Sequence, residues 1–180
     1  VSRSANGGNL NGPSTSPSIS DDGRLVTFVT SAPGVVGAPS QRGVTQVYLR
    51  DVTAEANELV SAVGTGLTAA DGDRDSDDPS ISANGRMVAF RSGATNLVRG
   101  DPDGMDVLVR DLRTVSRSTV IASVSTGGEP GENTFPSSGT AIGTGETGTT
   151  IDGTGRRVGF STNATSFDPR DANGIEDVYA

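Results

Sequence analysis

The sequence contains no cysteine, histidine, tryptophan or lysine, and most of these absences exclude a class of chemistry. Without cysteine the chain has no disulfides and no thiolate metal sites. Without histidine it lacks the commonest general base and the commonest transition-metal ligand. A Ser–His–Asp triad and a Ser–Lys dyad are both excluded, because each needs a residue type that is missing. We therefore expect that the chain is not an enzyme.

The charge is also one-sided: the net charge is −8, and all 14 basic residues are arginine. An acidic surface repels phosphate backbones, so we expect no nucleic-acid partner, whereas cationic partners and divalent metals suit it. No apolar run approaches the roughly 20 residues that span a bilayer. The first eight residues do not form a signal peptide, so an exported chain would begin here as a mature form or an excised piece.

Turn-forming residues and valine are abundant instead. The chain has 25 glycines and 9 prolines, and valine outnumbers leucine by more than two to one. Glycine and proline punctuate the chain with turns, and valine favours strands over helices. This composition predicts many short β-strands.

The most informative feature is an internal repeat. The segment 17–28 (PSISDDGRLVTF) recurs at 79–90 (PSISANGRMVAF), and a third copy is split into Pro136-Ser137 and 151–160 by a Gly/Thr-rich insert at 138–150. Each copy predicts a hairpin whose turn glycine adopts a positive φ. In its second strand the alternation puts Val and Phe on one face and a smaller residue on the other, which suits sheets that stack face to face.

Further strands follow in each unit, at 46–51, 106–111 and 177–180. A fourth strand follows at 58–63 and 119–124, and the third unit has none. However, Gly7-Gly8 matches Gly127-Gly128 after the second unit, so residues 1–4 are predicted to complete the last unit. Four-stranded repeats of this kind are typical of propeller blades. We predict an all-β chain, a β-propeller of four-stranded antiparallel blades in one domain, 1–180, with repeats at about 14–63, 76–124 and 133–180 plus the N-terminal strand 1–4.

These blocks resemble the TolB-type, WD-repeat-like β-propeller repeats of bacterial envelope and secreted proteins. The likeness is carried by 79–90, by Asn96-Leu97-Val98 and by the strand 106–111, and it covers the chain apart from the insert. It implies a propeller fold and a secreted, periplasmic or cell-envelope location. Closed propellers have four to eight blades, so three blades imply a homodimer that completes a six-bladed ring, a segment of a longer chain, or an open arc.

The best candidate site is the set of acidic loops. Carboxylates at every second residue, and two loops before third strands, offer the oxygen ligands that Ca²⁺ prefers. Ser76 and Ser82 replace residues that an EF-hand needs, so this is not an EF-hand. The alternative is that these side chains cap turns. The candidate calcium ligands are Asp71, Asp73, Asp75, Asp77, Asp101, Asp103, Asp106, Asp171, Asn173 and Asp177.

The repeated arginines and the insert are weaker candidates. Arg24, Arg86 and Arg156 follow the turn glycine, while Arg50 and Arg110 precede an aspartate. They form either a ring that grips an anionic ligand or, as repetition favours, the same salt bridge in each blade. The insert 138–150 is either a binding loop or a neutral one.

Together these features predict a secreted or envelope-associated binding or scaffolding module, stabilised by calcium, that recognises a protein or glycan partner. The alternatives are a carbohydrate-active enzyme that uses carboxylates, and a purely structural accessory domain of a larger exported protein.

Overall fold

The computed structural model describes residues 2–37, 43–64, 70–101, 104–113, 117–131, 149–172, 175 and 177–180. Within these ranges every regular element is a β-strand, and all the paired strands are antiparallel, which confirms the all-β prediction. No helix suited to crossing a membrane occurs in the same ranges.

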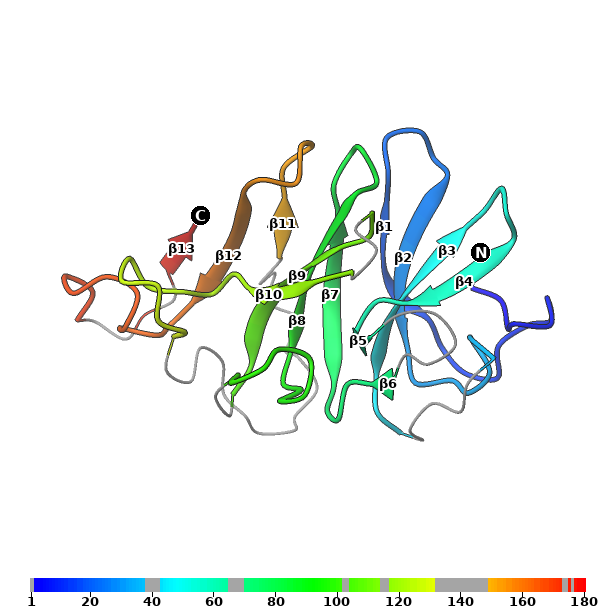
Figure 1. The fold of residues 1–180 in the computed structure, drawn as a ribbon, viewed down its shortest axis with the longest axis horizontal. Helices are drawn as coiled ribbons and strands as arrows, with labels where there is room; N and C mark the ends of the chain where they lie inside the picture. Colours follow the sequence, from blue (N-terminus) through cyan, green and yellow to red (C-terminus); the bar gives the residue numbers. More distant parts are fainter. Residues whose placement is uncertain are drawn as a thin grey trace.

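Three sheets follow one another along the longest axis of the molecule (Figure 1). The first sheet has the order β1-β2-β3-β4, the middle sheet β7-β8-β9-β10, and the third sheet β11-β12-β13. Strands β5 and β6 form a small hairpin between the first and middle sheets. The bounds are β1 Thr15–Ile19, β2 Leu25–Thr30, β3 Gln46–Asp51, β4 Ala56–Leu59, β5 Ala62–Val63, β6 Ala70–Asp71, β7 Ser76–Ile81, β8 Met87–Ser92, β9 Asp106–Asp111, β10 Thr119–Ile121, β11 Thr150–Ile151, β12 Val158–Thr162 and β13 Asp177–Tyr179.

The sheets stack because the repeated strands are apolar on both faces. Val29 and Val47 of the first sheet lie in one buried cluster with Phe90 of the middle sheet. Val107, on the opposite face of the middle sheet, lies in a second cluster with Phe160 of the third sheet. The phenylalanines of the second and third repeats therefore face the preceding sheet, and the face with the smaller residue receives the next one, as the alternation predicts.

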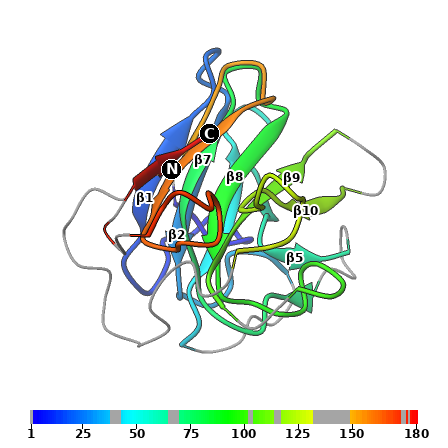
Figure 2. The ribbon, with the colours of Figure 1, turned by 90° about the vertical axis from the view of Figure 1, so that its left-hand side faces the viewer.

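Hydrogen bonds also join neighbouring sheets. The Ser18 hydroxyl accepts a bond from the Ile81 N–H at 3.1 Å, and the Ser80 hydroxyl accepts one from the Ile151 N–H at 3.3 Å. Looking along the stack, Figure 2 shows β1 and β7 one behind the other. The serine of the repeated Pro-Ser-Ile-Ser block is thus the joint between first strands, a role that its sequence did not reveal.

The prediction for the N-terminal strand is wrong within a single chain. The Asn57 side chain donates to the Arg3 carbonyl at 2.7 Å, and the Ala5 N–H donates to the Gly34 carbonyl at 2.8 Å. These bonds hold the N-terminal residues on the first sheet, whereas the C-terminus lies at the opposite end of the stack (Figure 1). Residues 2–4 therefore do not complete the third sheet, for which the described residues supply three strands, and the sheets that they form do not close into a ring.

The predicted fourth strands are also shorter than expected. Strands β4 and β10 end at Leu59 and Ile121, because the chain then bends away and pairs with the segment that leads to the next sheet. Residues 138–148 of the insert lie outside the described residues. Thr150 belongs to β11, where it pairs with Gly159, so the end of the proposed insert is part of the third sheet.

The turn glycines give a direct test of the stacking. Gly23 and Gly85 have φ values of 70° and 66°, but a Cβ atom at Gly85 would lie 2.8 Å from Cδ1 of Leu25 in the first sheet, while one at Gly23 would meet nothing within 4 Å. We expect Gly23→Ala to lower the free energy of unfolding by about 1 kcal/mol through backbone strain. Gly85→Ala should cost about 1 kcal/mol more, since Leu25 must move. Urea unfolding of both variants checks this, and equal losses would contradict it.

Candidate functional site

The functional candidates lie at the two opposite edges of the stacked sheets. The tip edge is formed by the turns 20–24, 82–86 and 152–157, together with the turns that follow β3 and β9. The connection edge is formed by the described segments that link β2 to β3 and one sheet to the next, and by their equivalents. The predicted calcium ligands that the structure describes belong to the connection edge, whereas Asp103 and Asn173 lie outside the described residues.

Most carboxylates of the loop 71–78 bind protein donors. Asp73 accepts bonds from the Thr95 N–H at 2.8 Å and hydroxyl at 2.9 Å, and Asp75 accepts bonds from the same two groups of Thr45, at 2.7 and 2.8 Å. Asp77 forms a buried ion pair with Arg91, at 2.9 Å. The bond from Asp75 to Thr45 crosses from the middle sheet to the first. The bonds of Asp73 thus fit the alternative that these side chains cap turns. The bonds of Asp75 instead connect the middle sheet to the first.

Asp101 and Asp106 are neighbouring carboxyl groups at the connection edge, and each affects the pKa of the other. Burial, followed by the nearby charge of Asp106, raises the pKa of Asp101 to about 7. Burial also raises the pKa of Asp106, which is only 2% exposed and accepts a bond from the Ser123 hydroxyl at 2.7 Å. Because the pKa of Asp101 is raised to about 7, Asp101 holds its proton through the acidic pH range.

The first sheet has a neutral amide where the middle sheet has Asp106. Gln46 accepts a bond from the Ser61 hydroxyl and donates one to the Gly72 carbonyl at 2.9 Å. The serine is therefore the same in both sheets, and only its partner changes from amide to carboxyl. In both sheets, a serine hydroxyl after the fourth strand therefore binds an oxygen of the side chain that begins the third strand.

The third sheet treats its acidic loop differently. The Tyr179 hydroxyl donates to Asp171 at 2.9 Å, and burial together with this carboxylate raises the pKa of Tyr179 to about 12. Asp177 begins β13 and is exposed. Among the described residues, no three acidic, histidine or cysteine side chains are grouped as a metal site requires. The Asp101–Asp106 pair resembles a cation site most, since the charge of Asp73 also raises the pKa of Asp101. Calcium binding stays a prediction.

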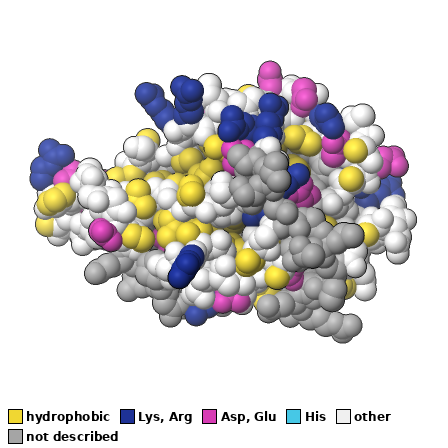
Figure 3. Space-filling view, viewed as in Figure 1, with side chains coloured by type: hydrophobic (Ala, Val, Ile, Leu, Met, Phe, Trp, Pro, Cys, Tyr) yellow, Lys and Arg dark blue, Asp and Glu magenta, His cyan; other side chains and the backbone are white. Residues whose placement is uncertain are grey.

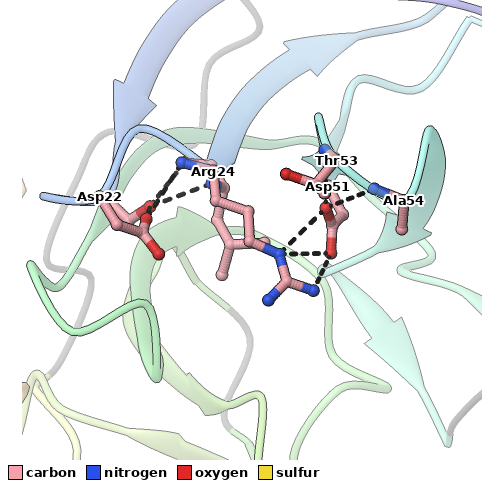
Figure 4. A network of polar contacts seen from close by, with 7 residues as sticks. Asp22, Arg24, Asp51, Thr53 and Ala54 are labelled. Carbon is pink, nitrogen blue, oxygen red and sulfur yellow. Dashed lines mark hydrogen bonds and ion pairs between the residues drawn. The ribbon is translucent and has the colours of Figure 1, made fainter.

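At the tip edge, the repeated arginines form the repeated salt bridge. Arg24 binds Asp51 at 2.7 Å, and Arg86 binds Asp111 in the same way at 2.8 Å. Figure 4 shows Arg24 between Asp22, which accepts its backbone N–H, and Asp51. The Arg24 guanidinium is the main reason that the pKa of Asp51 falls to about 2. The two arginines are therefore fixed in matching orientations on successive sheets.

The other repeated pair of arginines supports the fold. The Arg50 guanidinium donates to the Glu55 carbonyl at 2.7 Å, within its own sheet. Arg110 is buried and donates to the Ala62 carbonyl of β5 at 2.7 Å and to the Thr119 hydroxyl at 3.0 Å, so it fastens the small hairpin to the middle sheet. Neither side chain belongs to a ring for an anionic ligand.

Sequence reasoning did not recognise how strongly the tip edge presents arginine. The side chains of Arg24 and Arg86 are 54% and 47% exposed, whereas those of Asp51 and Asp111 are 18% and 9% exposed. Figure 3 shows Arg side chains gathered along this edge. In both sheets the arginine immediately precedes the residue that pairs with the aspartate: Leu25 pairs with Asp51, and Met87 pairs with Asp111. The repeated arginine and the repeated aspartate were the sequence signal for this salt bridge.

Comparison with known proteins finds similarity among solved structures. No protein-family model matches the chain, and no curated protein matches it. Among solved structures, the crystal structure of TolB from Acinetobacter baumannii is similar, with 16% sequence identity and a TM-score of 0.49 over 93% of this chain. The matched region is 29% of that TolB chain, so the present chain spans less than a third of its length. The functional argument therefore relies on the geometry of the sheets and their edges.

The carboxyl pair predicts an unusual dependence of stability on pH. Because the pKa of Asp101 is about 7 in the folded chain and near 4 when unfolded, the folded state holds more protons between these values. The contribution of Asp101 to the free energy of unfolding is therefore greatest below pH 4 and decreases as the pH rises to 7. Asp101→Asn should remove this fall and be more stable than the parent at pH 8 by about 1–2 kcal/mol.

Urea unfolding at pH 5 and pH 8 measures this effect. Asp168→Asn is the control, because the Arg170 guanidinium lowers the pKa of Asp168 to about 2 and the sign is opposite. The control should not become more stable at pH 8. An Asp101→Asn variant with the same pH dependence as the parent would show that Asp101 does not hold its proton in the folded chain.

Proposed function

We propose that the chain is a β-propeller-type binding and scaffolding module, exported to the bacterial cell envelope, whose tip edge binds an extended acidic segment of a protein partner. The observation that carries this proposal is the repeated Arg–Asp pair on successive sheets. Arg24 and Arg86 occupy the same place in the first and middle sheets, and Arg156 follows the matching turn of the third.

The pair prepares each guanidinium for a ligand. Arg24 uses Nε and Nη2 on Asp51, so the carboxylate fixes its plane while the side chain remains largely exposed. The carboxylate lies behind the guanidinium, and the surface that a partner meets is therefore the arginine. Such preorganisation reduces the entropy lost on binding. Guanidinium groups are also well matched to carboxylates, because two parallel N–H donors can bind both oxygens.

The spacing of the sheets suggests the form of the partner. Stacked sheets lie about 10 Å apart, so equivalent arginines repeat at about that distance. A polyproline II segment advances about 3.1 Å per residue with three residues per turn, so acidic side chains at every third residue would lie on one face and match the arginines. Interactions of this kind contribute chiefly to specificity and to the rate of encounter, so binding should weaken with salt.

The carbohydrate-active alternative would need a pair of carboxyl groups on either side of a glycosidic bond. The Asp101–Asp106 pair has the raised pKa that a general acid needs. However, Asp106 is almost fully buried, whereas a glycosidase needs both carboxyl groups to face the glycosidic bond. The geometry thus favours binding over turnover.

Binding to immobilised peptides tests the proposal. Peptides with acidic residues at every third position should bind the chain at low salt, and an Arg24→Gln/Arg86→Gln variant should lose about tenfold in affinity. Arg170→Gln is the matched control, because Arg170 pairs with Asp168 outside the repeated hairpins and is 90% exposed, and it should bind like the parent. Equal binding by the double variant would overturn the proposal.

A panel of acidic glycans, assayed for both binding and cleavage, tests the glycan partner and the enzyme.

Calcium binding at the connection edge has a separate test. If the folded chain binds Ca²⁺ there, its melting temperature should rise with Ca²⁺ concentration after removal of metal with EDTA, because a ligand that binds only the folded state stabilises it. Asp101→Asn should reduce the rise. An unchanged melting temperature in the parent would leave these carboxylates with capping and joining roles alone.

A further inference from the structure

Among the described residues, no fourth strand pairs with β13, whereas the third strand of each of the other two sheets pairs with a fourth. In all three sheets the third strand pairs with the second in the same register, so Asp177 and Val178 stand where Gln46 and Val47, and Asp106 and Val107, stand. Val47 and Val107 are completely buried, but Val178 is 82% exposed. An apolar strand residue with this exposure marks a surface that awaits a partner.

In the other two sheets, a serine that follows the fourth strand binds the backbone N–H of the equivalent valine. The Ser61 hydroxyl accepts the Val47 N–H at 3.0 Å and donates to the Gln46 side chain. In the middle sheet, the Ser123 hydroxyl accepts the Val107 N–H at 3.0 Å and donates to the Asp106 carboxylate at 2.7 Å. The β13 edge offers the same two groups, the Val178 N–H and the Asp177 carboxylate.

The N-terminal residues carry the same serine in the same setting. Ser123 is followed by the bridge between Val124 and Pro130, and Ser2 is followed by the bridge between Arg3 and Asn9. Both hairpins close with the same two bonds, between residues 4 and 8 and between 7 and 4 in one, and between 125 and 129 and between 128 and 125 in the other. Their turn glycines have φ values of 78° and 84°. Ser2 is therefore the structural equivalent of Ser123.

Ser2 cannot reach β13 of its own chain, since bonds to Asn57 and Gly34 hold the N-terminal hairpin at the other end of the stack (Figure 1). The N-terminal hairpin also occupies the place on the first sheet that β5–β6 occupies on the middle sheet, because Asn57 and Arg110 bind the equivalent carbonyls of Arg3 and Ala62. The N-terminal hairpin can thus stay on the first sheet of its own chain while Ser2 binds a sheet stacked in front of that first sheet.

We propose that the edge of β13 binds the N-terminal strand of a second copy of this chain, in a head-to-tail contact. In this contact the Ser2 hydroxyl of one copy accepts the Val178 N–H of the other and donates to Asp177. The first sheet of one copy then covers Val178 of the other. Ile19, 58% exposed where its equivalent Ile81 is 6% exposed, becomes buried on the same side. Such a contact closes a ring of two copies if their rotation allows it.

Cysteine cross-linking in the full chain tests the register, because the chain has no cysteine of its own. A mixture of Ser2→Cys chains and Asp177→Cys chains should form a disulfide-linked pair under mild oxidation. A Ser123→Cys/Asp106→Cys chain, which places the same pair within one molecule, is the positive control. Asp22→Cys chains, with the cysteine at the opposite edge of the sheet, should not link to Asp177→Cys chains.

The solution mass of the unmodified chain tests the assembly. Light scattering across a range of concentrations should show a dimer, or a longer assembly, that Val178→Asp converts to monomer without changing the circular dichroism spectrum, because Val178 is exposed in the single chain. Ser2→Ala should raise the dissociation constant about tenfold, while Ser4→Ala, which affects only the hairpin's own bonds, should not. A monomer at all concentrations, or an assembly that Val178→Asp leaves intact and that gives no cross-link, would overturn the proposal.

Discussion

The whole structure depends on one constraint: the first and middle sheets are apolar on both faces, so each of them needs a cover on both faces. Val47 and Tyr48 are adjacent on β3 and point to opposite faces, yet both are almost completely buried. A single sheet of this kind would expose one of these faces to water, at a cost of about 25 cal/mol for each Å² of apolar surface. Stacking is therefore obligatory, and the small face, the large face and the turn glycine of each repeat all serve it.

The same constraint explains why charged groups in this chain act as joints. Between stacked sheets there is little room for water, and a polar group there needs a protein partner. Arg110 meets this need with a backbone carbonyl of the neighbouring hairpin, and Asp75 with the N–H and hydroxyl of Thr45. At the edges, where water is present, the arginines instead pair within their own sheet and still face outward.

The sequence predicted the features that depend on neighbouring residues. The hairpins, the positive φ of Gly23, Gly85 and Gly155, and the alternation around Phe90 follow from local chemistry and the repeat. The features that failed depend on distant contacts. Strand β4 ends at Leu59 because the chain turns toward the next sheet, and nothing in 58–63 marks that bend. The N-terminal residues match the equivalent segment of the repeat, but Asn57 decides where they lie.

The candidate site divides in the same way. The sequence offered the acidic loops as one group, yet the partner of each carboxylate depends on which loops the stacking brings together. Asp75 binds a residue 30 positions away, and Asp101 owes its raised pKa to burial and to Asp106. The salt bridges of Arg24 and Arg86 were among the alternatives that repetition favoured. The exposure of the two arginine side chains was not predicted, because it depends on how the side chains are ordered at the ends of the strands.

The order of strands has a consequence for how the chain folds. Each sheet is made from consecutive strands, in the same order along the chain as across the sheet or in its reverse. Pairings within a sheet therefore join strands that are neighbours along the chain. A chain emerging from a ribosome or an export channel could complete the first sheet before β9 appears. Each finished sheet would then offer its small-residue face as the template on which the next one condenses.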